Sequence, residues 1–193
     1  MTQWLLVLLG YIVGTLPSAY FFGKKFTGKD IRGLGDGNMG ARNAYHEISH
    51  VIGILVFFID ATKGLLVILT AQLFNASQTV VLATGVAVVV GHNWPLFLHF
   101  RGGRGEATTI GVLYALMPPP MLIMTPPTII TLLIAKNVIV TSAVLFIGLP
   151  LVCWWQGVSG LMVLYAIGLA CLVGITHFFN RHRVEDIASA GTT

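Results

Sequence analysis

Three short polar stretches hold most of the residues of this chain that could do chemistry. They span residues 24–47, 99–106 and 180–186, and each combines basic side chains with glycine, asparagine or histidine. Guanidinium groups and unhindered backbone amides are groups with which proteins bind phosphates and carboxylates. The residue types therefore indicate a site for anionic ligands that is assembled from separate parts of the chain.

The first stretch has the pattern of an anion-binding loop. Residues 30–43 read Asp-Ile-Arg-Gly-Leu-Gly-Asp-Gly-Asn-Met-Gly-Ala-Arg-Asn. Glycine permits positive φ angles and lets backbone amides approach a ligand closely. A flexible connector is the alternative interpretation, although a linker would not usually combine this glycine spacing with Arg32, Arg42, Asn38 and Asn43.

The second stretch places a Gly-Gly-Arg-Gly sequence, residues 102–105, directly before an apolar run. Backbone amides at a helix start, the positive end of the helix dipole and Arg104 together favour a phosphate. Basic glycine loops also simply flank membrane helices, so this pattern alone leaves both interpretations open. His177 precedes the third stretch, which begins at Asn180. The spacing of three residues places both side chains on the same face of a helix.

Composition defines the elements that must position these stretches. The chain has 193 residues, of which 55% are hydrophobic and 9% charged, and its mean hydropathy is +0.84. Soluble domains have roughly 25% charged residues. Asp, Glu, Lys and Arg are absent from residues 1–23, 64–100, 107–135 and 137–179. A helical span needs about 20 apolar residues. We therefore expect an all-α, polytopic integral membrane protein in which residues 1–193 form one domain.

The apolar runs divide into seven transmembrane or membrane-embedded helices. Turns are expected around residues 75–78, at the three prolines of residues 118–120, at Lys136 and Asn137, and around residues 156–160. The fourth and fifth helices are short, and Pro126 and Pro127 should bend the fifth, so a short tilted pair is expected. A five-span arrangement would leave Lys136 without a polar environment. The predicted helices are residues 3–23, 51–74, 79–98, 107–116, 121–135, 138–155 and 159–179.

With seven spans, ten of the eleven lysines and arginines share one side with all three polar stretches. Lysine and arginine near the ends of spans stay in the cytoplasm. We therefore expect three cytoplasmic loops that form one site. The exception is Lys63, three residues after Asp60 on the same face of a predicted span. A structural ion pair between them is the favoured interpretation, since a paired charge costs far less in lipid than a single one.

The three polar stretches resemble the three cytoplasmic motifs of the bacterial acyl-phosphate:glycerol-3-phosphate acyltransferase family, PlsY. Order, spacing and the seven-span arrangement agree over nearly the whole chain. The first motif is matched by Asp30, Ile31, Arg32, Gly35, Gly37, Asn38, Gly40, Ala41 and Asn43, the second by Gly91, His92, Phe100, Gly102, Gly103, Gly105, Ala107 and Thr108, and the third by His177 and Asn180, with Arg183 as a further match.

This resemblance implies transfer of a fatty acyl group from acyl phosphate to the 1-hydroxyl of glycerol 3-phosphate, giving lysophosphatidic acid and phosphate. It implies no metal or organic cofactor, membrane lipid as a partner, and an active site at the cytoplasmic face of the bacterial inner membrane. Substrate phosphate itself would accept the hydroxyl proton. The implied catalytic residues are His177, Asn180 and Arg104. The implied substrate-binding residues are Arg32, Gly37, Asn38, Gly40, Ala41, Arg42, Asn43, His92, Gly102, Gly103, Gly105, Ser142 and Arg183.

The chain also departs from the family pattern within the motifs. Acidic residues stand at Asp36, where the family usually has serine, and at Glu106, where it usually has a small apolar residue. Carboxylates beside a phosphate site oppose anion binding. The alternative hypothesis is therefore a catalytically impaired relative that binds lipid or phosphate. The further departures are Arg42 for threonine, His46 for arginine, Arg104 for lysine and Phe179 for glutamate.

Other functional classes fit the residues less well. Every histidine lacks the aspartate five residues later that one large acyltransferase class requires, and the two cysteines match no metal or redox spacing. A metal-dependent CDP-alcohol phosphotransferase would need further aspartates. A transporter would need polar residues along the midplane of its spans. The basic residues lie beside the membrane without interleaved aromatic residues, which argues against nucleic acid as a partner.

Overall fold

The computed structural model describes the backbone of residues 2–190 and the side chains of residues 3–179. Every regular element within this part of the chain is helical, as the sequence predicts. In chain order the elements are η1 (Thr2–Trp4), α1 (Leu5–Gly14), α2 (Ser18–Thr27), η2 (Ile31–Gly33), α3 (Ala41–Glu47), α4 (His50–Leu73), α5 (Gln78–Asn93), η3 (Leu96–Leu98), α6 (Glu106–Leu116), α7 (Pro118–Ala135), α8 (Val138–Trp155) and α9 (Gly160–Ala190).

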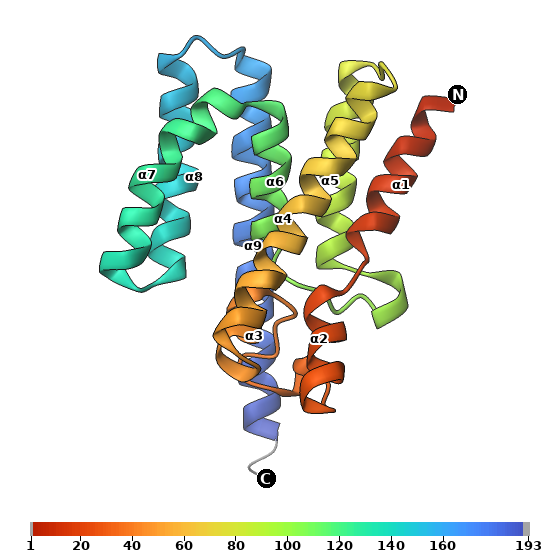
Figure 1. Ribbon diagram of the computed structural model, residues 1–193, viewed down its shortest axis with the longest axis vertical. Helices are drawn as coiled ribbons and strands as arrows, with labels where there is room; N and C mark the ends of the chain where they lie inside the picture. Colours follow the sequence, from red (N-terminus) through yellow and green to blue (C-terminus); the bar gives the residue numbers. More distant parts are fainter. Residues whose placement is uncertain (1, 191–193) are drawn as a thin grey trace.

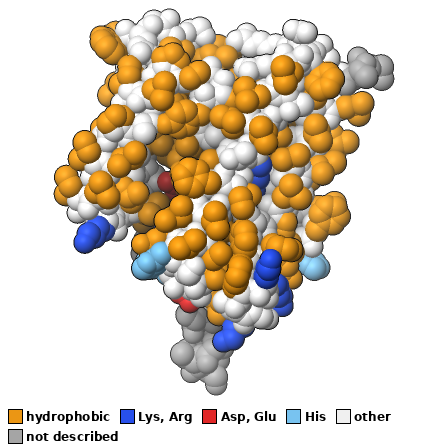
Figure 2. All heavy atoms as spheres, viewed as in Figure 1, with side chains coloured by type: hydrophobic (Ala, Val, Ile, Leu, Met, Phe, Trp, Pro, Cys, Tyr) orange, Lys and Arg blue, Asp and Glu red, His pale blue; other side chains and the backbone are white. Residues whose placement is uncertain are grey.

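The apolar helices form a membrane-spanning bundle. Among the described residues, six segments are long and apolar enough to cross a membrane, and α6 is a shorter apolar helix. Apolar side chains cover most of the face seen in Figure 2, while the basic side chains visible there gather mainly toward the lower end. The protein is therefore a multi-pass membrane protein, and the predicted seven-helix arrangement agrees with the six spans plus α6. The six segments are Leu5–Thr27, His50–Leu73, Gln78–Leu98, Pro118–Ala135, Val138–Trp155 and Gly160–Phe179.

Close backbone contacts hold the centre of this bundle together. A Cβ atom added at Gly64 of α4 would lie 2.2 Å from the carbonyl oxygen of Thr108 in α6, and one at Gly111 of α6 would lie 1.8 Å from that of Ala61. Gly14 of α1 approaches the carbonyl oxygen of Val88 in α5 in the same way. Small residues at helix crossings are the usual basis of packing in lipid, where van der Waals contact replaces the hydrophobic effect.

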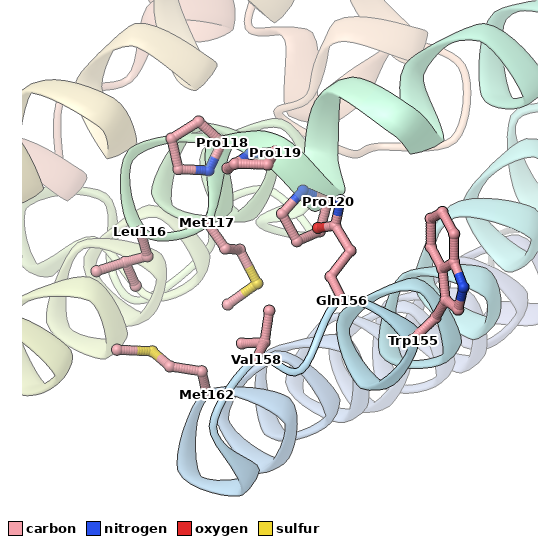
Figure 3. Close-up of a pocket in the computed structure, with 9 residues that line it drawn as sticks. All are labelled: Leu116, Met117, Pro118, Pro119, Pro120, Trp155, Gln156, Val158 and Met162. Carbon is pink, nitrogen blue, oxygen red and sulfur yellow. The ribbon is translucent and has the colours of Figure 1, made fainter.

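The remaining helices pack around α4 and α6. In Figure 1 the α7–α8 hairpin stands on one side of the bundle and α1 with α5 on the other. The apolar core runs between them and includes Val112 of α6, Leu149 of α8 and Leu169 of α9. At the end of the bundle opposite the polar loops, a hollow of about 620 Å³ lies between the α6–α7 joint and the α8–α9 turn (Figure 3). Its lining carries no Asp, Glu, Lys or Arg among the described residues.

The predicted continuous helix over residues 3–23 is wrong. The chain forms α1 and α2 with a break at residues 15–17. Pro17 lacks an amide hydrogen and disfavours the helical conformation of Leu16, which explains the break. As a result the carbonyl oxygens of Gly14 and Leu16 are available to another partner, and the Lys63 ammonium donates to both, at 3.2 and 3.3 Å.

Other boundaries also differ from the predictions. The prolines of residues 118–120 begin α7 instead of forming a turn, because the first turn of a helix does not need its amide hydrogens. The first polar stretch includes the helix α3, α5 ends at Asn93, five residues before the predicted end, and α9 continues past residue 179. The predicted turn between α7 and α8 is confirmed, since Lys136 adopts a φ of 48° and the Asn137 side chain caps α8.

Replacement of Gly111 by alanine should destabilise the protein. The added methyl group has no room against the Ala61 carbonyl, so α4 and α6 must separate, which should cost about 1–3 kcal/mol. Unfolding of the purified protein in mixed micelles measures this cost. The matched control is Gly168→Ala on α9, where an added Cβ meets no described atom within 4 Å. Equal stability of the two variants would contradict the packing described for α4 and α6.

Candidate active site

The first glycine loop, residues 30–40, is folded around the side chain of Asn43. This amide is 3% exposed. Its Nδ2 donates to the carbonyl oxygens of Ile31, Leu34 and Asn38, at 3.3, 2.9 and 3.0 Å. Its Oδ1 accepts from the Asp36 amide at 3.3 Å. The Asn43 side chain is therefore bound to the loop backbone and holds the loop in shape, while its predicted contact with substrate stays a prediction.

The second glycine loop, residues 101–105, lies against the end of α5. The last carbonyl groups of a helix have no partner within it. Here the Gly103 amide donates to the His92 carbonyl and the Gly102 amide to the Asn93 carbonyl, both at 3.1 Å. A Cβ at Gly103 would lie 2.1 Å from Nε2 of His92, so only glycine permits this approach. At the other end of the loop, Gly105 has a φ of 78° and directly precedes α6 as its N-terminal capping residue.

The third motif is fixed to the same end of α5. Nδ2 of Asn93 donates to Oγ1 of Thr176 at 3.0 Å, and both side chains are buried. His177 follows Thr176 in α9 and is half-buried. This hydrogen bond fixes the position of α9 along its own axis relative to the second loop. Asn180 and Arg183, which the sequence also predicts for the site, lie outside the residues whose side chains are described.

An ion pair joins the two glycine loops. The Arg104 guanidinium lies 3.1 Å from Oδ2 of Asp36, and the Arg104 side chain is only 12% exposed. The other carboxylate oxygen of Asp36 accepts from the Asn38 amide at 3.1 Å. Ser142 of α8 donates to the Glu106 carboxylate at the start of α6. Two groups that the sequence predicts for substrate, Arg104 and Ser142, are therefore in contact with acidic side chains of the chain itself.

Buried polar atoms without a hydrogen-bond partner mark the same region. Proteins pair nearly all such atoms, because an unpaired one costs free energy. Among the described side chains there are five, and they come from the first loop, the end of α5, the second loop and the start of α6. They are Oδ1 of Asn38, Oδ1 of Asn93, Nε of Arg104, and Oγ1 of Thr108 and Thr109. A polar ligand held here would gain donors and acceptors that the chain does not use.

A buried charged cluster lies beneath the second loop. The Lys63 ammonium is 2.9 Å from the Asp60 carboxylate and 2.7 Å from Nδ1 of His92. Ser18 donates to Asp60 at 2.8 Å. An ammonium group only donates, so Nδ1 of His92 accepts and its hydrogen belongs on Nε2, the atom that faces Gly103. The predicted Asp60–Lys63 pair is present, and His92 supports the loop from below. The predicted contact of His92 with substrate stays a prediction.

Arg32, within the first loop, contacts Asp30 of the same loop and two residues outside it, Leu98 and Tyr20. Its guanidinium lies 2.6 Å from Asp30, donates to the Leu98 carbonyl at 3.1 Å and stacks on Tyr20. The hydrogen bonds from Arg32 lower the pKa of Asp30, and Asp30 in turn raises the pKa of Arg32. A polar hollow of about 630 Å³ lies beside them, lined by Asp30, Arg32, Gly33, His99 and Arg101. These contacts give Arg32 a role in joining the first loop to η3.

The other predicted residues lie around the loops. Gly37 has a φ of 66°, and Gly40 caps α3, which Ala41 and Arg42 begin. Arg42 and Arg104 both act electrostatically on Glu106. The predicted site residues did not include Asn93, Thr108 or Thr109, although Thr108 is among the residues that match the second motif. The signal that could have identified them is polarity inside membrane helices, where each polar side chain costs free energy unless it has a function or a partner.

The sequence of the chain is similar to those of known enzymes along its full length. The family model described as glycerol-3-phosphate acyltransferase matches residues 4–186. A glycerol-3-phosphate acyltransferase 4 from Dehalococcoides mccartyi is 47% identical over 179 residues, which is 93% of this chain and 97% of the relative. A glycerol-3-phosphate acyltransferase from Thermotoga petrophila is 33% identical over 186 residues, covering 95% of this chain and 93% of the relative.

The fold is similar to that of a solved membrane protein. The glycerol 3-phosphate form of PlsY, an integral membrane glycerol 3-phosphate acyltransferase, superposes with a TM-score of 0.85 at 30% identity, covering 96% of this chain and 93% of that one. Its lysophosphatidic acid form gives a TM-score of 0.81 at 28% identity, covering 98% and 93%.

Loss of the Lys63 ammonium should destabilise the protein. In Lys63→Met the Asp60 carboxylate, 1% exposed, is left without its cation, and breaking a buried pair in this way costs about 3–5 kcal/mol. Unfolding in mixed micelles measures the loss. The double variant Asp60→Asn, Lys63→Met should recover part of it, and Lys136→Met, at an exposed turn, should stay within about 0.5 kcal/mol of the original protein. A single variant as stable as the double one would refute the buried pair.

Proposed function

The chain belongs to the glycerol-3-phosphate acyltransferase family, and we propose that its acyl donor is an acyl phosphate. The protein is a membrane acyltransferase that acts on glycerol 3-phosphate in phospholipid synthesis. In the proposed reaction the 1-hydroxyl oxygen attacks the acyl carbonyl carbon, the bond from that carbon to the phosphate oxygen breaks, and lysophosphatidic acid and inorganic phosphate leave. The two solved PlsY forms are named for the acceptor and the product of this reaction.

The observation that carries this proposal is that the second glycine loop and α9 are both bound to the end of α5, and that the first glycine loop is joined to the second. The Gly102 and Gly103 amides hold the second loop, Asn93 holds α9 through Thr176, and the Asp36–Arg104 ion pair adds the first loop. Arg104, with an unpartnered Nε, and the hydroxyl groups of Thr108 and Thr109 lie where they meet. A compact phosphate with several oxygen acceptors fits such a set of donors, because it can accept many charge-assisted hydrogen bonds at once.

The roles of the remaining residues follow from their chemistry. We assign Arg104 and Arg42 to neutralising phosphate charge, and the α6 amides together with Gly102, Gly103 and Gly105 to shaping the phosphate site. We assign Ser142, on the helix α8, to contact with the donor. His177, Asn180 and Arg183 belong to α9, and we assign them to orienting and polarising the substrates. Acyl phosphate is already activated, so positioning and charge neutralisation supply much of the rate.

The proton and the acyl chain need separate routes. Phosphate oxygen accepts the proton of the attacking hydroxyl, which spares the protein a strong general base. The chain of the donor is apolar and must reach the site from lipid. Figure 2 shows a hollow in the apolar surface, with an acidic side chain at its base, on the side of the α7–α8 hairpin. The Glu106–Ser142 contact joins α6 to this hairpin, so we propose that the chain enters there.

We propose that the end of the bundle that is rich in lysine and arginine faces the cytoplasm. Lysine and arginine concentrate at the end of the bundle that carries the two glycine loops, and such residues stay on the cytoplasmic side. The active site then faces the cytoplasm from the bacterial inner membrane. Water-soluble glycerol 3-phosphate would reach it from that side, while the acyl donor and the lysophosphatidic acid product remain in the lipid.

A second candidate function is a relative that binds phosphate or lipid without transfer. The contacts of Asp36 with Arg104 and of Glu106 with Ser142 favour it, because they occupy predicted substrate groups with carboxylates. Phosphate release from palmitoyl phosphate and glycerol 3-phosphate distinguishes the two. Substrate binding without product would support the binding protein, and product formed in the presence of a chelator would support the acyltransferase.

Alanine at Arg104 or at His177 should lower kcat/KM for this reaction by on the order of 10²-fold, since each removes a preorganised polar group from the site. The measurement is phosphate release by the purified protein. The matched control is Arg101→Ala, which removes an exposed cation from the same loop and should stay within about twofold of the original activity. Unchanged kinetics in both site variants would refute these assignments.

A further inference from the structure

Asp36 differs from the other acidic residues of the first polar stretch, residues 24–47, in what it contacts. Asp30 pairs with Arg32 on the far flank of the loop, and Glu47 is exposed on α3. Asp36 instead reaches across to the second loop, where its Oδ2 lies 3.1 Å from the Arg104 guanidinium. Its carboxylate is held in this direction by the Asn38 amide, which donates to Oδ1 at 3.1 Å.

Arg104 is the cation that this contact engages, and it still has unused donors. Its side chain is 12% exposed, and its Nε is buried without a partner. A guanidinium has five N–H donors in a planar fork, which fits a phosphate better than a single carboxylate oxygen. The contact with Asp36 therefore leaves part of the Arg104 fork for a second anion that would come from solution.

Two effects of Asp36 on that second anion oppose each other. The carboxylate fixes the direction of the Arg104 guanidinium, which favours binding because Arg104 then loses less conformational entropy when the anion binds. It also cancels the charge of Arg104 and repels a nearby dianion. Repulsion between charges a few ångströms apart in a partly buried site is large compared with the gain from restricting one side chain. The repulsion should prevail.

We infer that Asp36 is an affinity-determining residue of the active site: its carboxylate competes with the phosphate of the ligand for Arg104 and keeps phosphate binding weak. This inference rests on the proposed function for its substrate, glycerol 3-phosphate, and for its product, inorganic phosphate. On binding, phosphate takes over donors of Arg104 from Asp36. When phosphate leaves, the ion pair forms again, so the pair assists product release.

The test compares the affinity for inorganic phosphate in the original protein, in Asp36→Asn and in Asp36→Ser. Asparagine keeps the acceptor for the Asn38 amide and removes the charge. Isothermal titration in detergent should give a Kd about tenfold lower in both variants, which is about 1.4 kcal/mol. Phosphate should also become a stronger inhibitor of acyl transfer, and the KM for glycerol 3-phosphate should fall while kcat changes by less than about twofold.

Two controls separate competition for Arg104 from a general effect of charge. Glu47→Gln removes one negative charge from the adjoining helix α3 and should change the Kd for phosphate by less than about twofold. In an Arg104→Gln background, Asp36→Asn should lose most of its effect, because the cation for which the carboxylate competes is gone. The near-ultraviolet circular dichroism of each variant confirms that it is folded.

An unchanged or weaker affinity in both Asp36 variants would overturn the inference, and so would an equal gain in Glu47→Gln. Failure of the proposed function looks different. If phosphate binds more tightly to the Asp36 variants but no protein releases phosphate from palmitoyl phosphate, then the competition stands and the acyl transfer does not.

Discussion

The polar end of the bundle depends on the contacts that the ammonium group of Lys63 makes with several helices. In lipid every backbone carbonyl needs a partner within the protein. The break at Pro17 frees the carbonyl groups of Gly14 and Leu16, and Lys63 donates to both of them while it neutralises Asp60. One buried cation thereby joins α1 and the break before α2 to α4, and its contact with His92 adds α5. Ser18 of α2 is held by Asp60 of the same pair.

The position of the second glycine loop depends on the contact between Lys63 and His92. Its amides bind the last carbonyl groups of α5, and Gly103 lies directly on the imidazole of His92. Asn93, the next residue, holds α9 through Thr176. A displacement of His92 would therefore move both the loop that carries Arg104 and the helix that carries His177. Such rigid support is what a site needs if most of its rate comes from positioning.

The sequence was sufficient for the membrane class, for most of the membrane helices and for the polar segments that gather at one end of the bundle, because long apolar runs and clustered charges have few other interpretations in lipid. The spacing of Asp60 and Lys63 also predicted their pairing. The partners of single polar side chains could not be predicted. Asn43 and His92 can bind a ligand or another group of the protein equally well, and spacing does not distinguish these uses. Pro17 is a local signal for the break before α2, but the contact of the Gly14 and Leu16 carbonyl groups with Lys63, which is 46 residues from Pro17, could not be predicted from local patterns.

Asp36 has opposite effects on the stability of the ligand-free protein and on the binding of an anion. A guanidinium as buried as that of Arg104 is costly without a counter-charge, so an acidic neighbour stabilises the folded protein before any ligand arrives. The same neighbour then opposes the dianion that the site must bind. Functional sites commonly accept such conflicts between stability and activity. In the reaction proposed above the conflict has a chemical use, because an enzyme that releases phosphate in every cycle gains nothing from holding it tightly. A carboxylate that returns to Arg104 would lower the free energy of the state in which the product has left.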